Sequence, residues 1–417
     1  MVGIFSRNRA AGFCASMLVF GAVSSGAEAQ YKEKILYSFT GGTDGDGPGG
    51  SLIADAQGNL YGTTSLGGRG DCGDVGCGTV FRLTPKGKEA VLYAFSGGSD
   101  GGNPNGGLIA DAEGNLFGTT FSGGRNSCFD YCGTVFEVTP KGKETVLYTF
   151  TGGSDGSAPF GGLVADSQGN FYGTTFYGTT NFVYGTTAPG GIGCCGTVFE
   201  LTPKGMETVL YSFLRPGDGR PDARLIADSQ GNLYGTTQSG KRNCNHYNCG
   251  TVFEIAGQNS KKRTVLYSFA DKEDGANPLG VIVDAEGNLY GVTESGGNHR
   301  CDRIGCGTVF EVTPQGTKNV LHTFRGGKDG AYPDGALLAN AQGDLYGTTG
   351  GGGSPDQGTV FEVTPQGTET VVYAFKGGDD GVYPAGGLIA DAQGNLYGTT
   401  EAGGTSGKGT VFEIEKK

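Results

Sequence analysis

A seven-residue motif, Gly-Asn-Leu-Tyr-Gly-Thr-Thr, recurs seven times along the chain and limits the folds open to it. Four of the copies carry a single replacement, and successive copies begin 56, 55, 62, 56, 56 and 51 residues apart. Self-similarity at a period of this size is the signature of solenoids, propellers and other repeat arrays. We therefore expect one supersecondary unit, used seven times. The copies begin at Gly58, Gly114, Gly169, Gly231, Gly287, Gly343 and Gly394.

Each repeat contains four short runs rich in Val, Leu, Tyr, Phe and Thr, with Gly, Pro or Asn between them. In the first repeat these runs are residues 51–55, 59–64, 78–83 and 90–95. Such runs bounded by turn residues predict strands, and none has the 3.6-residue period of a helix. Four strands per repeat match a propeller blade better than a β-helix rung, whose period is much shorter. The sequence thus predicts an all-β fold, a seven-bladed β-propeller of four-stranded antiparallel blades.

The two ends of the chain indicate how the ring closes. We name the strands of a blade A to D, from the axis outward. The seventh repeat has runs A, B and C but no run D, whereas residues 34–39 form an isolated D-like run ahead of the first repeat. Placing that run on the outside of the last blade completes seven blades and removes an exposed sheet edge. Residues 34–39 are therefore predicted to be a latch strand.

The N-terminus has the features of a secretory signal peptide. Arg7 and Arg9 precede an apolar run over residues 10–23, and a small-x-small site follows at residues 27–29. The run is too short for a transmembrane helix. We expect residues 1–29 to be removed and residues 30–417 to form one propeller domain that is secreted, periplasmic or at the cell surface, without an integral membrane span. The formal net charge of −12 opposes nucleic-acid binding.

The repeats are similar to a known family. The Gly-Asn-Leu-Tyr-Gly-Thr-Thr block and the Cys-Gly-Thr-Val-Phe-Glu-Val-Thr-Pro-x-Gly block recur from Tyr31 to the C-terminus, and both resemble the gloeo/verruco (GloVer) repeat of exported bacterial proteins. The turn that joins strands A and B is more distantly similar to that of NHL-type propellers. The resemblance implies a secreted or surface propeller without a settled activity.

The loops that join the strands suggest where a ligand binds. In a meander blade, the D-to-A and B-to-C loops emerge on one face, and here they are long and variable, as binding loops on a rigid scaffold usually are. The D-to-A loops share an Asp-Gly pair, so that seven carboxylates on one rim could bind calcium or hydrogen-bond a polyol. The simpler interpretation, which needs no ligand, is that they open turns, since Asp bonds nearby backbone and Gly adopts positive φ. These aspartates are Asp44, Asp100, Asp155, Asp218, Asp274, Asp329 and Asp380.

Ten cysteines follow the signal peptide and fall in pairs within the B-to-C loops of the first five repeats. Local pairing in an exported chain predicts five disulfides. Zinc is the alternative, but ligands a whole blade apart would not converge and no histidine accompanies the pairs in register, so we expect no metal site. Apart from calcium at the rim, no cofactor is predicted. The pairs are Cys72 with Cys77, Cys128 with Cys132, Cys194 with Cys195, Cys244 with Cys249 and Cys301 with Cys306.

The third repeat has a long B-to-C insertion whose aromatic residues could stack on the apolar faces of sugar rings or pack the loop onto its neighbour. These residues are Tyr177, Phe182 and Tyr184. Catalytic signals are scarce. The histidines form no Ser/His/Asp or metal-ligand pattern along the sequence, although the last of them replaces a strand D tyrosine. They are His246, His299 and His322.

These observations favour a binding protein over an enzyme. We expect the D-to-A and B-to-C loop face to recognise an extracellular glycan or a partner protein. The alternatives are a polysaccharide lyase or hydrolase that uses rim carboxylates, and a purely structural surface protein. An enzyme would need two neighbouring acidic side chains in different environments near the axis, which breaks the repeat symmetry. A multivalent binder, in contrast, can reuse a seven-fold rim.

Overall fold

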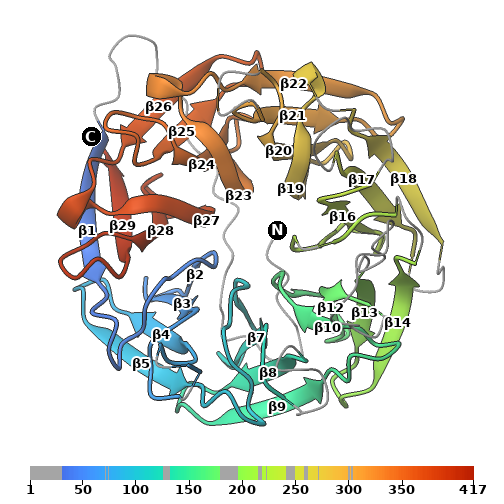
Figure 1. The fold of residues 1–417 in the computed structure, drawn as a ribbon, viewed down its shortest axis with the longest axis vertical. Helices are drawn as coiled ribbons and strands as arrows, with labels where there is room; N and C mark the ends of the chain where they lie inside the picture. The colour runs from blue at the N-terminus through green and yellow to red at the C-terminus, as the bar shows by residue number, and fades with distance from the viewer. Residues whose placement is uncertain are drawn as a thin grey trace, which may run out of the picture.

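The structure, a computed structural model, is a ring of seven antiparallel β-sheets around a central axis (Figure 1). It describes residues 31–417 except 71, 74, 125–131, 179–195, 215–217, 222, 241–248, 258–261, 271, 299–300 and 302–303. Six sheets have four strands, and the sheet of the third blade has five because its strand A is divided in two. The predicted seven-bladed β-propeller is confirmed.

The strands follow one order in every blade, from the axis outward. Strands A are β2 (Ile53–Ala54), β6 (Ile109–Ala110), β10 (Ser157–Pro159) with β11 (Val164–Ala165), β15 (Ile226–Ala227), β19 (Ala276–Val283), β23 (Ala331–Ala339) and β27 (Val382–Ala390). Strands B are β3 (Leu60–Thr64), β7 (Leu116–Thr120), β12 (Phe171–Tyr177), β16 (Leu233–Thr237), β20 (Leu289–Ser295), β24 (Leu345–Gly351) and β28 (Leu396–Ala402).

The outer half of each blade completes the meander. Strands C are β4 (Thr79–Leu83), β8 (Thr134–Val138), β13 (Thr197–Leu201), β17 (Thr251–Ile255), β21 (Thr308–Val312), β25 (Thr359–Val363) and β29 (Thr410–Lys416). Strands D are β5 (Glu89–Ala94), β9 (Glu144–Thr149), β14 (Glu207–Ser212), β18 (Arg263–Ser268), β22 (Lys318–Thr323), β26 (Glu369–Ala374) and β1 (Tyr31–Ser38). Three D-to-A loops contain a single 3₁₀ turn, η1 (Lys272–Asp274), η2 (Gly327–Asp329) and η3 (Gly378–Asp380).

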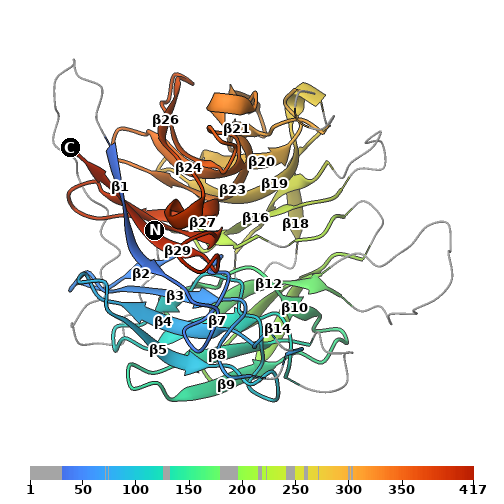
Figure 2. The same cartoon turned by 60° about the vertical axis from the view of Figure 1, so that its left-hand side comes forward.

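The ring closes through the N-terminal strand. β1 runs along the outside of the last blade and pairs antiparallel with β29, from Tyr31 opposite Lys416 to Ser38 opposite Thr410 (Figure 2). The latch predicted over residues 34–39 is therefore present, and it begins three residues earlier, at Tyr31. Closure in this way pairs the outer edge of a strand C that would otherwise lie open.

The repeated motif has a separate packing reason at each of its last three positions. A Cβ on Gly62 would lie 2.7 Å from Cζ of Phe81, so only glycine leaves room for that ring. Thr63 donates from Oγ1 to the carbonyl of Gly106 in the next blade, at 3.3 Å. Thr64 pairs with Thr79 of strand C at 2.9 Å between the two Oγ1 atoms, and all seven blades contain this buried threonine pair.

The core is a set of contacts between neighbouring blades. At each of the seven blade interfaces, a fully buried phenylalanine that follows strand D meets the strand C phenylalanine of the next blade edge to face. The ring centroids lie 5.0–5.4 Å apart. Such pairs contribute about 0.5–1.5 kcal/mol each beyond their burial. Blade packing, rather than any single sheet, therefore holds the ring together.

The innermost backbones approach one another closely around the axis. A Cβ on Gly106 would lie 2.9 Å from the backbone nitrogen of Gly162 in the third blade. Between the last blade and the first, the nitrogen of Gly387 donates to Oγ of Ser51 at 2.8 Å. Small residues at these positions allow the innermost strands A to approach one another. The residues next to them on the loop-face side then lie around the axis.

Candidate functional site

The seven predicted rim aspartates lie in the outer part of the loop face, where they organise their own loops. Asp155 is 6% exposed and accepts four hydrogen bonds, from the hydroxyl of Tyr148 (3.0 Å), the nitrogen and Oγ1 of Thr151 (2.7 and 2.6 Å) and the nitrogen of Gly153 (3.2 Å). Burial alone would raise the pKa of the equivalent Asp44, but hydrogen bonds from Thr40 and Tyr37 lower it below its ordinary value.

The same pattern recurs around the rim. The Tyr seven residues before the aspartate donates to it in five loops, and the backbone nitrogen four residues before it donates in six. These donors belong to the loop itself or to the end of strand D, so the six aspartates that accept them close turns. Ligand binding by the aspartates stays a prediction.

The described residues confirm two of the five predicted disulfides. Cys72 bonds Cys77 and Cys301 bonds Cys306, with Cα atoms 5.2 and 5.1 Å apart. Cys132 and Cys249 are also disulfide-bonded. Their predicted partners lie outside the described residues, as do both members of the adjacent pair in the third blade, and these positions are Cys128, Cys194, Cys195 and Cys244. Phe182 and Tyr184 likewise fall outside the described residues.

The disulfide loops hold the backbone next to the axis in an unusual conformation. In five blades the residue before the proline that opens strand A has positive φ without being glycine, and its nitrogen donates to a carbonyl of the preceding blade's B-to-C loop. In four of these the acceptor is the second cysteine of a pair. Non-glycine residues in this region cost free energy and tend to gather at functional sites. They are Asn103, Ala158, Asn277, Tyr332 and Tyr383.

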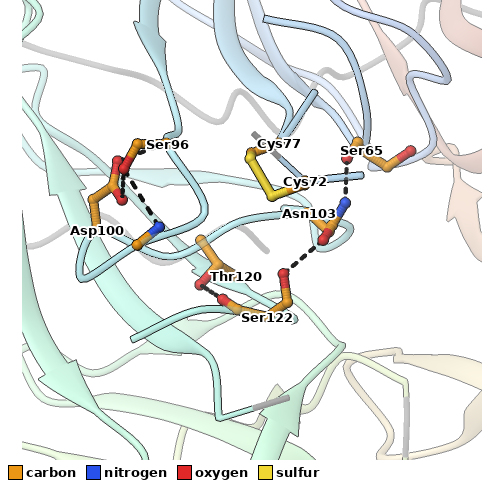
Figure 3. Close-up of a disulfide and its surroundings, with 9 residues drawn as sticks. Ser65, Cys72, Cys77, Ser96, Asp100, Asn103, Thr120 and Ser122 are labelled. Carbon is orange, nitrogen blue, oxygen red and sulfur yellow. Dashed lines mark hydrogen bonds between the residues drawn. A yellow bond between two sulfur atoms is a disulfide. The ribbon is translucent and has the colours of Figure 1, made fainter. Parts of the chain in front are cut away.

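Asn103 shows how tightly such a residue is held (Figure 3). Its nitrogen donates to the carbonyl of Cys77 at 2.7 Å, and its Nδ2 donates to the carbonyl of Ser65 at 2.9 Å. Its Oδ1 accepts from Oγ of Ser122 at 2.6 Å. The Cys72–Cys77 disulfide therefore fixes a residue of the neighbouring blade beside the axis.

Aromatic rings occupy one side of the axis on the loop face. Phe160 follows Pro159 in the third blade and is 41% exposed. Its ring centroid lies 5.9 Å from that of Phe121 and 6.2 Å from that of Phe176. The guanidinium of Arg220, in the fourth blade, stacks over Phe176 at 3.9 Å. The predicted Tyr177 packs edge to face against Phe176 at 4.8 Å, which brings it to the edge of this cluster.

Carboxyl groups occupy the opposite side. Glu294 and Glu401 stand at the position that Phe121 and Phe176 hold in their own blades, immediately after the last threonine of the motif. Asp334 lies between them on β23. Partial burial raises the pKa of all three, and for Glu294 and Glu401 the negative charge of Asp334 raises it further. Two hydrogen bonds offset part of this rise in pKa. The side chain of Asn277 donates to Glu294, and the backbone nitrogen of Gly335 donates to Asp334.

A single arginine stands at an otherwise small position of the innermost ring. Arg224 precedes β15, at the position that Ser, Gly or Ala occupies in the other six blades. Its Cδ would lie 3.5 Å from a Cβ on Gly162 of the third blade. The surrounding protein partly buries the side chain, and this desolvation lowers its pKa. The described residues provide its guanidinium with no hydrogen bond or ion pair.

We define the axial site as these residues from six different blades. Its members are Phe121, Phe160, Phe176, Arg220, Arg224, Asn277, Glu294, Asp334 and Glu401. None of these residues was predicted from the sequence, although the predicted Tyr177 is their neighbour. The missed signal lies in the aligned repeats. One column holds Arg224 where the other six copies have Ser, Gly or Ala, and the column after the motif varies between small, aromatic, amide and acidic residues.

A model of the Gloeobacter/Verrucomicrobia repeat matches the sequence over residues 21–183, 178–301 and 246–417. The chain belongs to this repeat family. The resemblance found in the repeated blocks is therefore confirmed, and the distant likeness to NHL-type propellers stays a prediction. No relative of curated function matches the chain in sequence.

Solved structures with a related fold differ widely from this member of the repeat family in sequence. A gluconolactonase of Xanthomonas campestris is 12% identical, with 93% of this chain and 90% of that chain covered and a TM-score of 0.43. A luciferin-regenerating enzyme is 15% identical over 74% of this chain and 90% of its own, with a TM-score of 0.44. A Bacteroides thetaiotaomicron protein of unknown function is 14% identical over 81% and 82%, with a TM-score of 0.40. A shared fold at this distance does not carry an activity across.

The opposite face of this repeat-family propeller has clefts between neighbouring blades. Cavities of about 200 and 370 Å³ lie between the first and second and the second and third blades. The first is lined by Asp55, Tyr61 and Arg82 among others, and the second by the equivalent residues of the next blade. Because the lining repeats with the blades, these clefts are gaps in blade packing. No helix among the described residues is long and apolar enough to cross a membrane.

Proposed function

We propose that this repeat-family protein is exported and binds a saccharide over the axial site. The observation that carries the proposal is the break in repetition there. One register position holds Phe121 and Phe176 in two blades but Glu294 and Glu401 in two others. One asymmetric site with an apolar side and a polar side suits one bound saccharide better than seven equal rim positions do.

The aromatic side supplies the apolar contact. The C–H faces of sugar rings are apolar and stack on aromatic rings, which present large area at low entropic cost. Phe160 offers the exposed ring, and Phe121 and Phe176 support it from neighbouring blades. The cation–π contact of Arg220 holds Phe176 in place from the other side.

The polar side supplies hydrogen-bond partners for hydroxyl groups. Glu294, Asp334 and Glu401 accept from hydroxyls, and they donate when protonated, a form that their raised pKa values favour. Arg224 has five N–H donors and no acceptor within the described part of the protein. It would bind hydroxyl oxygens or, more strongly, the carboxylate of an acidic sugar.

Export is part of the proposal and rests on two observations. The N-terminal sequence has the pattern of a cleaved signal, and the B-to-C loops contain disulfides, which persist in oxidising compartments. Both agree with a location in the periplasm, at the cell surface or outside the cell. An extracellular glycan is the ligand class that such a location offers.

The test is an array of neutral and uronate-containing glycans, probed with the oxidised protein that lacks residues 1–29. We expect selective, saturable binding that falls at least tenfold in Phe160→Ala and persists in Met206→Ala, which removes an exposed side chain (64%) from a turn on the opposite face. Stronger binding to uronates would point to Arg224. Loss in EDTA would instead point to calcium at the rim. Binding to no glycan, or equal loss in both variants, would contradict the proposal and leave a protein partner to be sought by pull-down.

A polysaccharide lyase or hydrolase is the second candidate, because the acidic side of the axial site meets the condition set for an enzyme. Asp334 is the more enclosed carboxyl and Glu401 is exposed, so the two have different environments. For this candidate, we expect wild-type protein to release oligosaccharides from a bound glycan and Asp334→Asn to bind without release. Binding without any product, at pH 5 to 8, would exclude it.

A further inference from the structure

The outer edge of each blade interface repeats a contact between two charged positions. The rim aspartate follows strand D of one blade in the sequence. A residue near the start of strand D in the next blade faces this aspartate. Glu89 faces Asp44 in this way, and Glu144 faces Asp100. Two carboxylates in close contact repel each other unless a proton or a cation lies between them.

In two interfaces the protein itself supplies the cation. Lys318 replaces the glutamate, and its Nζ lies 2.9 Å from Oδ1 of Asp274 while it also donates to the backbone carbonyl of that residue. Its side chain is 3% exposed. Arg263 holds the equivalent position opposite Asp218, with 3.6 Å between Nη1 and Oδ1. The fold therefore has a place for a positive charge at this point of the blade interface.

The interface between β22 and β26 combines the carboxyl pair with a nitrogen donor. Asp329 and Glu369 form the pair, and Oε1 of Glu369 is buried without a hydrogen-bond partner. His322 stands where the other six interfaces have a tyrosine. The tyrosine donates a hydrogen bond from its hydroxyl to the aspartate, for example from Tyr37 to Asp44 at 2.9 Å. An imidazole, in contrast, can give a lone pair to a metal ion.

The three side chains converge. One donor atom each from His322, Asp329 and Glu369 lies within 4.8 Å of the other two. Nε2 of His322 is buried, has no hydrogen-bond partner and lies 3.4 Å from Oδ1 of Asp329. The side chains of His322 and Asp329 are 15% and 21% exposed, so an ion could reach them from solvent.

We propose that His322, Asp329 and Glu369 form a binding site for a first-row divalent metal ion of the zinc class. Donors around a tetrahedral zinc ion at its usual bond lengths lie about 3.4 Å apart. Nε2 of His322 and Oδ1 of Asp329 already have this separation, and the carboxylate of Glu369 would have to move toward them. One imidazole with two carboxylates is a donor set for Zn²⁺ or Mn²⁺, while Ca²⁺ takes six or more oxygens. Three protein ligands leave the remaining position to water.

The ion would act as Lys318 does one interface earlier. It would place positive charge between two carboxylates and join strand D of one blade to strand D of the next. The ion would also bind Oε1 of Glu369, whose burial without a hydrogen-bond partner is otherwise costly. A metal at this edge is separate from the axial site and does not depend on the saccharide proposal.

The test begins with oxidised protein stripped by EDTA, dialysed, and titrated with Zn²⁺, Mn²⁺ or Ca²⁺ by calorimetry, with thermal unfolding in parallel. We expect one Zn²⁺ per chain and a higher Tm, with Ca²⁺ binding at least a hundredfold more weakly. The matched variant is His322→Tyr, which restores the residue of the other six interfaces and so should fold. It should lose at least a hundredfold in Zn²⁺ affinity. His246→Ala with His299→Ala should leave binding unchanged.

Two further variants test the geometry. Tyr373→His should place the same donor set opposite Asp380 and Glu33, where the carboxyl pair already exists, and raise the stoichiometry to two. Glu369→Lys should abolish Zn²⁺ binding yet keep the Tm of the metal-loaded protein, because the ammonium would take the position of the ion. Zn²⁺ affinity that survives His322→Tyr, or no Zn²⁺ effect on Tm in wild type, would overturn the proposal and leave a simple pair between His322 and Asp329.

Discussion

The outer rim and the axial site lie on the same face of the ring, but the blades repeat closely at one and depart from one another at the other. At the rim, the same aspartate accepts from the same loop donors in blade after blade. Around the axis, equivalent positions hold phenylalanine, glutamate or arginine. A requirement of the fold must be met in every blade, whereas one ligand needs only one asymmetric surface. Repetition therefore marks stability here, and its breaks mark candidate function.

The largest effect on stability should come from the rim. Asp155→Ala removes the acceptor for four hydrogen bonds in a buried turn, so we expect a loss of about 3 kcal/mol in the free energy of unfolding. Urea unfolding measures it, and Asp155→Asn, which keeps one acceptor oxygen, should lose less. Saccharide affinity should stay unchanged where the variant is folded. A variant of normal stability that fails to bind would show that the rim, and not the axis, holds the ligand.

A disulfide connects the two regions, and its removal should cost somewhat less. Cys72→Ser with Cys77→Ser opens a short loop, which the chain-entropy estimate values at about 2 kcal/mol. The same loop anchors Asn103 beside the axis, so we also expect a small loss of saccharide affinity, two- to fivefold. Cys301→Ser with Cys306→Ser is the comparison variant, because its loop anchors Tyr332, two residues before Asp334 of the axial site, so its loss of saccharide affinity should be at least as large. Unchanged saccharide affinity in both variants would separate the loops from the site.

At the axis, stability and binding should move in opposite directions. Arg224→Gly inserts the residue that four other blades carry at this position and removes a partly buried charge that has no partner among the described residues, so the free energy of unfolding should hold or rise. Saccharide affinity should fall about tenfold, or about 1.4 kcal/mol, with the larger loss for uronates. Calorimetry against the best glycan of the array measures it. Unchanged affinity would mean that Arg224 only fills the centre of the ring.

The fold could be predicted from the sequence because every repeat contains the residues that its own blade requires for packing. Gly62, Thr63 and Thr64 each meet a need inside one blade or at its next neighbour, and the need recurs seven times. The axial site could not be found in the same way. Arg224 and Glu401 are far apart in the chain and belong to one site only because closure of the ring brings their blades around one axis. His322 and Glu369 likewise belong to different repeats, so their spacing resembles no metal motif.

The smallest predicted effect concerns pH and compares blade interfaces with one another. Burial and the charge of the facing aspartate raise the pKa of Glu89 and Glu144 from 4.5 to about 7. The folded protein thus keeps protons that the unfolded chain has lost, so this stabilisation is present below about pH 4.5 and disappears as pH rises to about 7. Both side chains are only half enclosed, and solvent screening keeps each contribution below about 1 kcal/mol.

The measurement is Tm at pH 5, 6, 7 and 8 in wild type and in two variants. Glu89→Gln carries a neutral amide that can donate to Asp44 at every pH, so its Tm should fall less steeply with pH and exceed that of wild type at pH 8. Lys318→Glu should steepen the fall, because it turns an interface closed by an ion pair into one closed by two carboxyls. A Tm profile that neither change affects would show that these carboxyl pairs are already relaxed by solvent, and that only Lys318 and Arg263 use the charge position at the blade edge.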